Sequence, residues 1–324
     1  MSHSFFSEVI SDTGTHHGVL PKENDMDPIR IYYSDAYCHE GASFDTHAKA
    51  QLVAERLRSD TNVTIVAPNP ASSDELKLVH DHDYVDAILT GAPAGLAESN
   101  GFEWNAHLRD GILATTGGVR DAVLHALHNK VVSGSLSSGL HHAARGRGRG
   151  FCTVNGLALG AVQARRAGAH RVLILDVDAH CGGGTANIID EQPGIEQLDV
   201  SVIAFDYYEN TGNARLVMTD GPSYITDLTR ELCNVRNPDG IDLVLYNAGM
   251  DPHEGAGGVS GVTTDVIVER EQIVMDWCHH HGIPVAFALA GGYSGTERTM
   301  GEVADLHVHT LRAAAQTGQL INGL

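Results

Sequence analysis

The apolar and polar residues of this chain form two alternating patterns, which predict strands and helices in turn. Short apolar runs typical of buried strands lie at residues 29–33, 63–67, 131–133, 172–175, 200–205, 242–247 and 284–289. Between them, apolar residues recur at helical spacing in residues 46–57, 74–89, 108–128, 156–167, 224–233, 269–281 and 301–315. Strands that alternate with helices favour a parallel sheet covered on both faces. The predicted fold class is therefore α/β, with a central parallel sheet between helices.

The alternation continues from residue 29 onward without an internal repeat or an interdomain linker. We therefore expect residues 29–324 to form one domain, because α/β folds of this length occur as a single unit. Residues 1–28 are polar and have no sustained period, so we expect them to form an N-terminal arm.

One strand is followed by side chains that can bind a metal. The sequence LILDVDAHCGGG, residues 173–184, begins as a buried strand and ends in three glycines that allow a sharp turn. Asp176, Asp178 and His180 lie in between, and alternate residues of an extended chain point the same way. Buried carboxylates are costly without a partner, and Asp-x-His suits zinc or ferrous iron. The alternative is a helix-capping Asp with a hydrogen-bonded loop histidine.

Two further strands end in glycine-rich turns that carry reactive residues. They are LVLYNAGMDPHEGAGG, which contains Asp251, and VAFALAGGYS, which contains Tyr293. Sites in open α/β sheets form outside the carboxyl ends of the strands, so Asp251 can meet Asp178 and His180. Three protein ligands with one open position are typical of a catalytic metal. Tyr293 can approach from the third strand, although a tyrosine in the hydrophobic core is the alternative.

Two adjacent histidines are candidates for proton transfer. His141 and His142 lie near the start of a loop, residues 137–156, in which glycine and arginine alternate. A carboxylate behind a metal site commonly orients an imidazole, so we expect Asp176 to lie against one of them. We expect the pair to supply the general base, and ordinary loop histidines are the alternative.

Composition narrows the classes of partner. The formal net charge of −20 argues against direct nucleic-acid binding, because phosphate contacts need positive charge. The same charge either favours a cationic substrate or serves only solubility. Five scattered cysteines argue against a disulfide framework, and no apolar run has the length of a membrane-spanning helix. Without a signal-peptide pattern, we expect a cytoplasmic protein with no membrane partner. Nothing in the sequence indicates an oligomeric state.

Five short motifs together resemble a known enzyme family. GLHHA, GFCTVN, LDVDAH, AGMD and AGGY, in this order and spacing, are similar to the zinc-dependent histone deacetylase family, including its bacterial members and acetylpolyamine amidohydrolases. The resemblance extends over residues 29–315, nearly the whole chain. It implies the arginase–deacetylase fold and a metal-activated water that attacks an amide. The expected reaction removes an acyl group, expected to be acetyl, from a primary amine such as acetyl-lysine or an acetylated polyamine.

The resemblance also implies roles for individual residues. The family's zinc ligands fall on Asp178, His180 and Asp251. Its catalytic residues fall on His141, His142, Asp176 and Tyr293. The carbonyl that holds the substrate amide falls on Gly150, and the apolar wall of the substrate tunnel falls on Phe151. The family also carries a potassium ion, which would be bound by Asp176 and by the carbonyls of Asp178 and His180.

One departure from the family concerns the second histidine. Gly183 stands where the family usually has Asp or Asn as the partner of that histidine. We therefore expect His142 to lack a carboxylate partner, while His141 keeps Asp176. On this expectation His141 is the more basic of the two, because a nearby carboxylate favours the imidazolium.

The other departures concern the substrate rather than the metal. Ala204 and Asp206 replace a Ser and a His of the family, and the loop that follows is shorter than usual. Tyr208 is then the candidate for the second tunnel wall. SFDTHAKA, residues 43–50, replaces an early His-Pro-Glu segment. These changes favour the bacterial and class IV-like branches over typical class I enzymes.

Two other functions fit parts of this pattern. An arginase-like ureohydrolase shares the fold, but it needs a second metal and a further Asp at the position that Gly182 occupies. A non-catalytic protein that binds acylated amines would be expected to lack the tyrosine or a metal ligand, and here neither is lost.

Overall fold

A single parallel sheet of eight strands forms the centre of the molecule. The computed structural model describes residues 28–38, 48–137, 140–190, 192–295 and 297–321, so nearly all of the expected N-terminal arm lies outside the described residues. The strand order is β2-β1-β3-β8-β7-β4-β5-β6, and every neighbouring pair is parallel. The strands are β1 (Ile29–Tyr32), β2 (Val63–Val66), β3 (Val132–Ser135), β4 (Val172–Asp176), β5 (Ile195–Ser201), β6 (Ala214–Met218), β7 (Leu243–Gly249) and β8 (Val285–Ala290). The predicted α/β fold class is confirmed.

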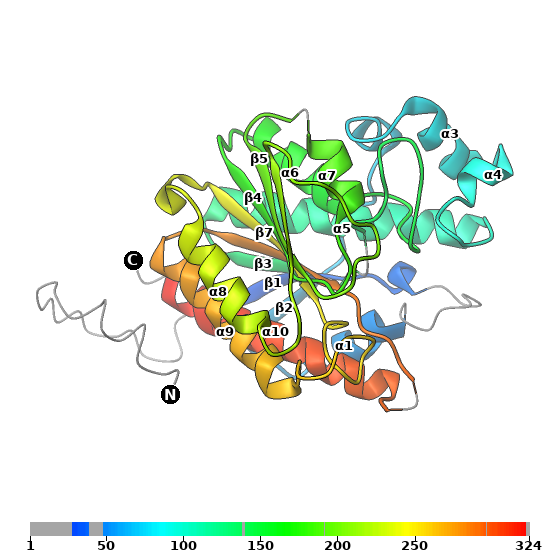
Figure 1. Cartoon of the computed structure of the whole chain (residues 1–324). Coiled ribbons are helices and arrows are strands. Elements are labelled where there is room, and N and C mark those ends of the chain that lie inside the picture. Colours follow the sequence, from blue (N-terminus) through cyan, green and yellow to red (C-terminus); the bar gives the residue numbers. More distant parts are fainter. Residues whose placement is uncertain (1–27, 39–47, 138–139, 191, 296, 322–324) are drawn as a thin grey trace, which may run out of the picture.

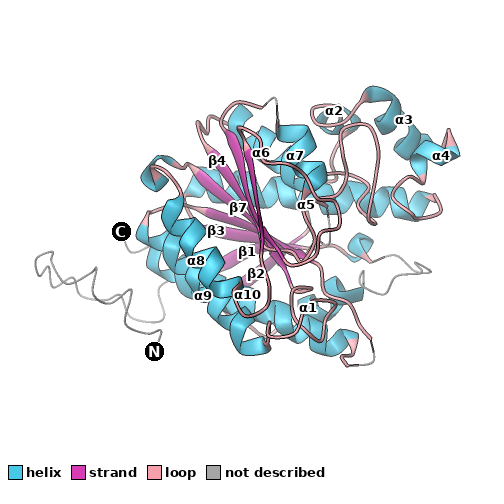
Figure 2. Ribbon diagram, in the orientation of Figure 1, coloured by secondary structure: helices cyan, strands magenta, loops and turns pink. Residues whose placement is uncertain are grey.

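Helices cover both faces of the sheet (Figure 1 and Figure 2). Helices α1, α8, α9 and α10 pack on one face, and α5, α6 and α7 pack on the other. Three short helices, α2, α3 and α4, lie at the periphery beyond α5. The helices are α1 (Lys49–Leu57), α2 (Ser73–Leu76), α3 (His82–Thr90), α4 (Ala94–Ala97), α5 (Ala106–Asn129), α6 (Gly156–Arg166), α7 (Gly183–Ile189), α8 (Tyr224–Asn234), α9 (Thr264–His280) and α10 (Met300–Ile321).

The helix predicted over residues 74–89 is two helices in the structure. A capping box between Ser72 and Glu75 starts α2 as its residue types indicate, but α2 ends after one turn. His80 then turns into the protein, where its Nδ1 lies 3.0 Å from the carbonyl oxygen of Ala144. The backbone N–H of Asp81 donates to Arg145 O at 2.9 Å. These hydrogen bonds to a distant loop break the helix, although the apolar spacing of the sequence is continuous across the break.

The strand predicted at residues 200–205 lies five residues earlier, at β5. This strand has no continuous apolar run, because it contains the polar residues Gln197 and Asp199. Both are buried, and their side chains form hydrogen bonds inside the protein. The N–H of Gly182 donates to Asp199 Oδ2 at 2.7 Å, for example. The apolar residues after Ser201 leave the sheet, and Phe205 is 40% exposed. The sequence also failed to indicate α7 and β6, which are short and bounded by glycine or polar residues.

The three central strands carry the three glycine-rich turns. Every residue of β4, β7 and β8 is buried, and these strands are consecutive neighbours in the sheet. Because they are parallel, their carboxyl ends lie at one edge, and the residues that follow them can meet there. The topology therefore brings together the turns that the sequence predicted to form one site.

Gly134→Ala is expected to destabilise this central packing. Gly134 of β3 pairs with Phe287 of β8, and a Cβ at Gly134 would overlap the fully buried ring of Phe287. Overpacking of a core costs about 1–3 kcal/mol, and we expect the free energy of unfolding to fall by that amount in a urea titration. Phe287→Leu should restore part of the loss. Gly212→Ala is the control, because its Cβ would meet nothing within 4 Å, and an equal loss there would contradict the packing explanation.

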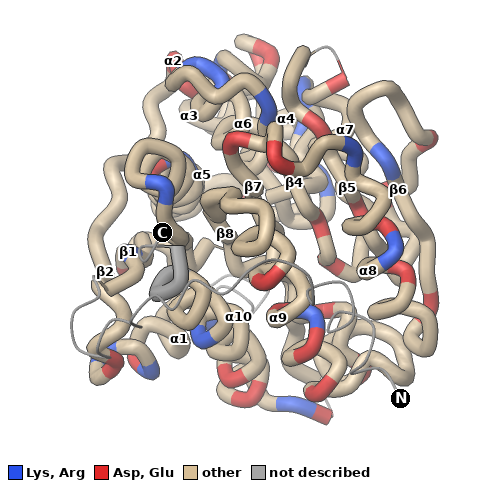
Figure 3. The backbone as a smooth tube through the Cα atoms, turned by 90° about the vertical axis from the view of Figure 1, so that its left-hand side faces the viewer, with Lys and Arg blue, Asp and Glu red and all other residues tan. Residues whose placement is uncertain are grey.

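Acidic residues outnumber basic ones along the chain. The sequence has 41 Asp and Glu against 21 Lys and Arg. Acidic positions recur along helices and loops on the side drawn in Figure 3. Among the described residues, no helix is both long and apolar enough to cross a membrane.

Candidate active site

Three potential metal ligands converge at the carboxyl ends of β4 and β7. Asp178 and His180 follow β4, and Asp251 follows β7. One ligand atom from each lies within 4.8 Å of the other two. His180 Nδ1 is 3.2 Å from Asp178 Oδ1 and 3.1 Å from Asp251 Oδ2. The structure thus brings together the three residues that the sequence grouped, and both carboxylates are buried.

The electrostatics of this cluster suit a cation. Burial and then the Asp178 carboxylate raise the pKa of Asp251. Burial disfavours ionised Asp178 as well, but His141 and His180 outweigh it and lower the pKa of that carboxyl. Burial also opposes the charge of His180, yet the two carboxylates raise its pKa to about 10. A positive charge among these groups is therefore strongly favoured, and two carboxylates with an imidazole nitrogen are donors that zinc or ferrous iron accepts.

His141 is held by a carboxylate behind the metal cluster. Its Nδ1 lies 2.8 Å from Oδ2 of Asp176, the fully buried last residue of β4. Asn247 on β7 donates to Asp176 Oδ1 at 2.8 Å and fixes that carboxylate. His141 Nε2 lies 3.5 Å from Asp178 Oδ1, so the ring extends between Asp176 and the cluster. Burial opposes the imidazolium, but Asp176 and then Asp178 raise the pKa of His141 well above its ordinary value.

His142 also has a carboxylate partner, so the expectation drawn from Gly183 was wrong. His142 Nδ1 lies 3.0 Å from Oδ2 of Asp206, a buried residue of the loop that follows β5. The predicted order of basicity still holds, but for another reason. Burial and then the neighbouring charge of His141 lower the pKa of His142 to about 4, and Asp206 only partly opposes them. The two rings lie 3.9 Å apart, centroid to centroid.

Replacing Gly183 is therefore expected to harm the site rather than complete it. A Cβ at Gly183 would overlap the backbone oxygen of Asp206 and lie 2.9 Å from its carboxyl carbon. We expect Gly183→Ala to displace Asp206 and to lower kcat about 10-fold, within the usual cost of losing a partner of a catalytic imidazole. Steady-state kinetics would measure this change. Gly95→Ala is the control because its Cβ would meet nothing within 4 Å, and unchanged kcat in Gly183→Ala would contradict the expectation.

Tyr293 reaches the cluster from β8. Its ring centroid lies 6.4 Å from that of His180. The turn before it needs glycine, because Gly291 and Gly292 have φ of +52° and +88°. A Cβ at Gly291 would overlap the Asp251 carboxylate, so this turn packs directly on one of the candidate metal ligands. Burial and then Asp251 raise the pKa of Tyr293, which keeps its hydroxyl protonated.

Two phenylalanines near this region are exposed, and one of them, Phe205, contacts the histidines. Phe151 is 43% exposed and Phe205 is 40% exposed. The Phe205 ring is 4.9 Å from that of His142, edge to face. A Cβ at Gly150 would lie 2.6 Å from the His142 ring and 2.9 Å from Phe205, so the backbone of Gly150 also borders this region.

Tyr208, the residue expected as the second tunnel wall, is partly buried. Its hydroxyl accepts a hydrogen bond from Gln197 Nε2 at 3.2 Å, and its ring packs partly buried against the core. Phe205 is the aromatic residue of this loop that touches His142 and His180. Because β5 ends at Ser201 and not at residue 205, the apolar pattern made Phe205 look like the end of a strand.

The sequence reasoning also missed a buried lysine. Lys49 of α1 is fully buried, and its amine donates to the carbonyl oxygen of Gly291, two residues before Tyr293. Burial lowers the pKa of Lys49 to about 8, against the pull of Asp251 and Asp178. Lys49 lies in the segment that replaces the family's His-Pro-Glu, and most of that segment is outside the described residues.

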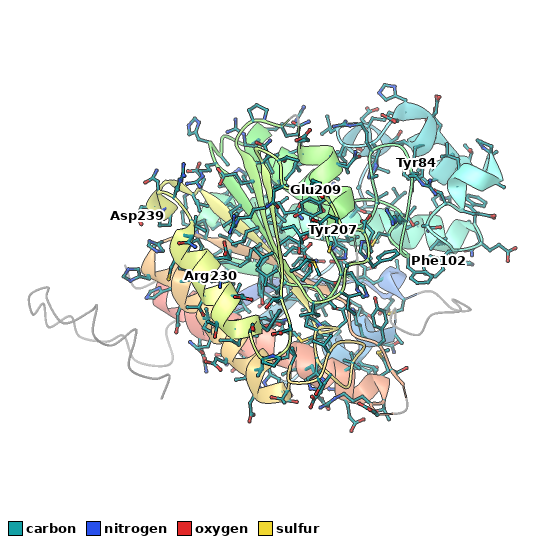
Figure 4. All side chains as sticks on the ribbon, in the orientation of Figure 1. Tyr84, Phe102, Tyr207, Glu209, Arg230 and Asp239 are labelled. Carbon is teal, nitrogen blue, oxygen red and sulfur yellow. The ribbon has the colours of Figure 1, made fainter. Side chains whose placement is uncertain are left out.

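A cavity of about 750 Å³ is lined by His142 and by residues of α7. His142, Gly183 and Asp206 form one wall, and Arg149 lines it as well. Figure 4 labels Tyr207 and Glu209, which line the cavity from the loop beside α7. Tyr208 also lines this cavity. Asp178, His180, Asp251 and Tyr293 are not among the residues that line this cavity.

Known proteins share both the sequence and the fold. The family model of the histone deacetylase domain matches residues 44–229. An uncharacterized protein of Picosynechococcus sp. is 32% identical over 226 residues, which cover 68% of this chain and 75% of that protein. The acetoin utilization protein AcuC of Staphylococcus aureus is 35% identical over 131 residues, or 37% of this chain and 34% of that protein. AcuC of Bacillus subtilis is 32% identical over 158 residues, which cover 46% of this chain and 41% of that protein.

A solved structure shows the same fold at lower sequence identity. The crystal structure of the HDA15 HD domain superposes with a TM-score of 0.73 over 90% of each chain, at 18% identity. This likeness supports the arginase–deacetylase architecture, while the family model covers more than half of the sequence. On these grounds the chain belongs to the histone deacetylase family.

Proposed function

We propose that this protein is a zinc-dependent amidohydrolase that removes an acyl group, in the first instance acetyl, from a primary amine. The observation that carries the proposal is the buried Asp178–His180–Asp251 cluster beside two histidines, each paired with its own carboxylate. Membership of the histone deacetylase family supports a deacetylase, and acetyl-lysine and acetylated polyamines are the candidate substrates.

The cluster would hold zinc through two carboxylates and His180 Nδ1, with ferrous iron as the alternative. Such an ion, when bound, polarises the substrate carbonyl and lowers the pKa of the attacking water. His142 lies with a neutral imidazole beside the cluster, because its pKa is lowered to about 4, and it is suited to accept the proton of the water. His141, which keeps a proton through Asp176, is suited to donate one to the leaving amine.

Tyr293 would act on the charge that develops on the substrate oxygen. Its hydroxyl stays protonated and is held on the turn that packs against Asp251. A donor aimed at a developing oxyanion is among the largest single contributions to hydrolysis of an acyl bond. Phe151 and Phe205 would flank the apolar stem of the acylated amine, and the carbonyl of Gly150 would accept the hydrogen bond of the substrate amide.

We further propose a potassium ion near Asp176, with a structural role. Asp176 and Asp199 are paired on neighbouring strands and are both fully buried. Burial and the nearby charge of Asp176 raise the pKa of Asp199 to about 8, so a second negative charge is disfavoured there. The backbone carbonyls of Asp178 and His180 would complete the ion's ligands.

The arginase-like alternative is poorly supported by the residues around the cluster. A second metal would need a carboxylate at position 182, but a Cβ at Gly182 would lie 2.7 Å from both Asp176 Oδ2 and Gln197 Nε2. The space for that ligand is therefore filled by other side chains. Counting bound metal ions per chain separates the two functions, because the deacetylase site needs one transition metal.

The proposed function is tested by metal removal and substrate comparison. The purified protein should hydrolyse a fluorogenic acetyl-lysine amide, lose that activity on chelation and regain it with zinc. Acetylated polyamines should be compared under the same conditions, because their positive charge suits a protein of net charge −20. Full activity in protein shown by elemental analysis to be metal-free would refute zinc dependence. Inactivity of the zinc-loaded protein on both substrate classes would refute the deacetylase proposal.

A further inference from the structure

Asp206 lies in an unusual backbone conformation. It is buried, and its φ is +61°, a left-handed value that is uncommon for a residue with a side chain. Strained residues of this kind persist where the surrounding structure holds them, and they concentrate at functional sites. This conformation turns the carboxylate inward while its neighbour Phe205 stays 40% exposed.

Three donors converge on the Asp206 carboxylate. Oδ2 lies 3.0 Å from His142 Nδ1 and accepts the N–H of Gly184 at 3.1 Å. Oδ1 forms an ion pair of 2.6 Å with the guanidinium of Arg149. Both oxygens are thus engaged. Because Asp206 Oδ2 accepts, the proton of a neutral His142 lies on Nδ1, which leaves Nε2 free to accept another.

Arg149 joins this pair to the rim of the site. Its guanidinium carbon lies 5.0 Å from the centroid of Phe205, within the range of a cation–π contact. The Phe205 ring in turn meets His142 edge to face. Arg149, Phe205, Asp206 and His142 therefore form one contiguous unit from the surface to the buried imidazole.

The unit depends on the absence of a side chain at position 183. A Cβ at Gly183 would overlap the Asp206 backbone oxygen and lie 3.0 Å from Asp206 Oδ1. The space next to His142 therefore has room for only one carboxylate-bearing residue. Here that residue comes from the loop after β5 rather than from α7.

We propose that Asp206 is the positioning residue of His142 and that Arg149 clamps its carboxylate. Asp206 selects the tautomer and the orientation of the imidazole without touching the substrate. The proposal rests on the proposed function insofar as His142 is the general base. The pairing of His142 with Asp206 can be tested independently of that function.

The cavity beside His142 makes a direct test feasible. Asp206 lines this cavity of about 750 Å³, so Asp206→Ala would leave a gap that small anions can enter from solvent. Arg149 would keep its positive charge at the gap. Formate carries the same carboxylate as the deleted side chain and is the probe for chemical rescue.

The kinetic arm compares Asp206→Ala with a matched variant. Asp206→Ala should lower kcat about 10- to 100-fold, the usual cost of removing the carboxylate that orients a functional imidazole, with little change in KM. Formate added to the assay should raise the kcat of Asp206→Ala at least tenfold. Asp190→Ala is the control, because Asp190 is exposed and lines the same cavity. It should keep its activity and show no response to formate.

The double variant Asp206→Ala with Arg149→Ala tests the clamp. It should lose most of the rescue, since formate would no longer meet a guanidinium. A folded, zinc-loaded Asp206→Ala that keeps normal kcat, or that formate does not rescue, would overturn the positioning role. Undiminished rescue in the double variant would overturn the role of Arg149.

The spectroscopic arm does not depend on activity. In protein labelled with ¹⁵N-histidine, the proton on His142 Nδ1 should give a downfield resonance, assigned by its loss in His142→Gln. Asp206→Asn, which keeps the shape of the side chain, should shift this resonance upfield or abolish it. An unchanged resonance would overturn the pairing. If the wild-type protein hydrolysed no acylated amine but showed this pattern, the proposed function would fail while the pairing stood.

Discussion

Asp178→Asn and Asp251→Asn are each expected to abolish both metal binding and activity. Each substitution removes one of the two carboxylates from a cluster of three candidate metal ligands. A bound ion contributes several kcal/mol to the stabilisation of charge in the transition state, so kcat/KM should fall by about 10³-fold or more. Zinc should be measured by elemental analysis in the same samples as the kinetics.

Asp110→Asn is the control for these variants. Asp110 lies on α5, its side chain is 58% exposed, and it pairs only with the adjacent Arg109 among the described residues. Losing this charge should change neither zinc content nor kcat/KM. Full zinc occupancy in purified Asp178→Asn and Asp251→Asn would refute their assignment as ligands.

Tyr293→Phe is expected to keep the metal and to lower kcat by about 10²–10³-fold, the cost of removing one donor to an oxyanion. The substitution deletes only a hydroxyl, so the packing of the ring near His180 should persist. KM should change less than kcat, because the lost bond is strongest in the transition state.

Tyr37→Phe separates this effect from the general loss of a buried hydroxyl. Tyr37 is also buried, and its hydroxyl bonds Ser135 Oγ at 3.0 Å, as part of the core rather than the cluster. Tyr37→Phe should lower the free energy of unfolding by about 1 kcal/mol and leave kcat unchanged. Near-normal turnover in Tyr293→Phe would make Tyr293 a packing residue, and loss of zinc in that variant would indicate a disturbed fold.

The sheet was predictable where strands are apolar throughout. β4, β7 and β8 are buried on both faces, so continuous apolar runs reveal them, and parallel topology then aligns their glycine-rich ends. β5 was misplaced because its buried polar residues, Gln197 and Asp199, bond to neighbouring groups that the sequence does not place. The break between α2 and α3 has the same origin, since His80 bonds to a loop 64 residues away.

The site was predictable to the extent that its residues follow strands. Asp178, His180 and Asp251 are tied to strand ends, so topology alone brings them together. Asp206 and Phe205 depend on where β5 ends and on one left-handed residue, which local sequence patterns do not indicate. Asp206 could still have been suspected, because an acidic residue replaces a histidine of the family in a chain that lacks the acid at position 183.

The overlap between Gly183 and Asp206 also constrains how such a site can change during evolution. A side chain added at 183 meets the backbone oxygen of residue 206, so an acid at 183 does not fit beside Asp206 in its present position. A change that brings the acid to 183 therefore has to be accompanied by a shift of the loop that carries residue 206. Relatives of this protein should accordingly have either Gly at 183 with an acid at 206, or Asp or Asn at 183 without an acid at 206. A search that requires the acid at 183 would miss chains such as this one, in which the carboxylate beside the same histidine comes from residue 206.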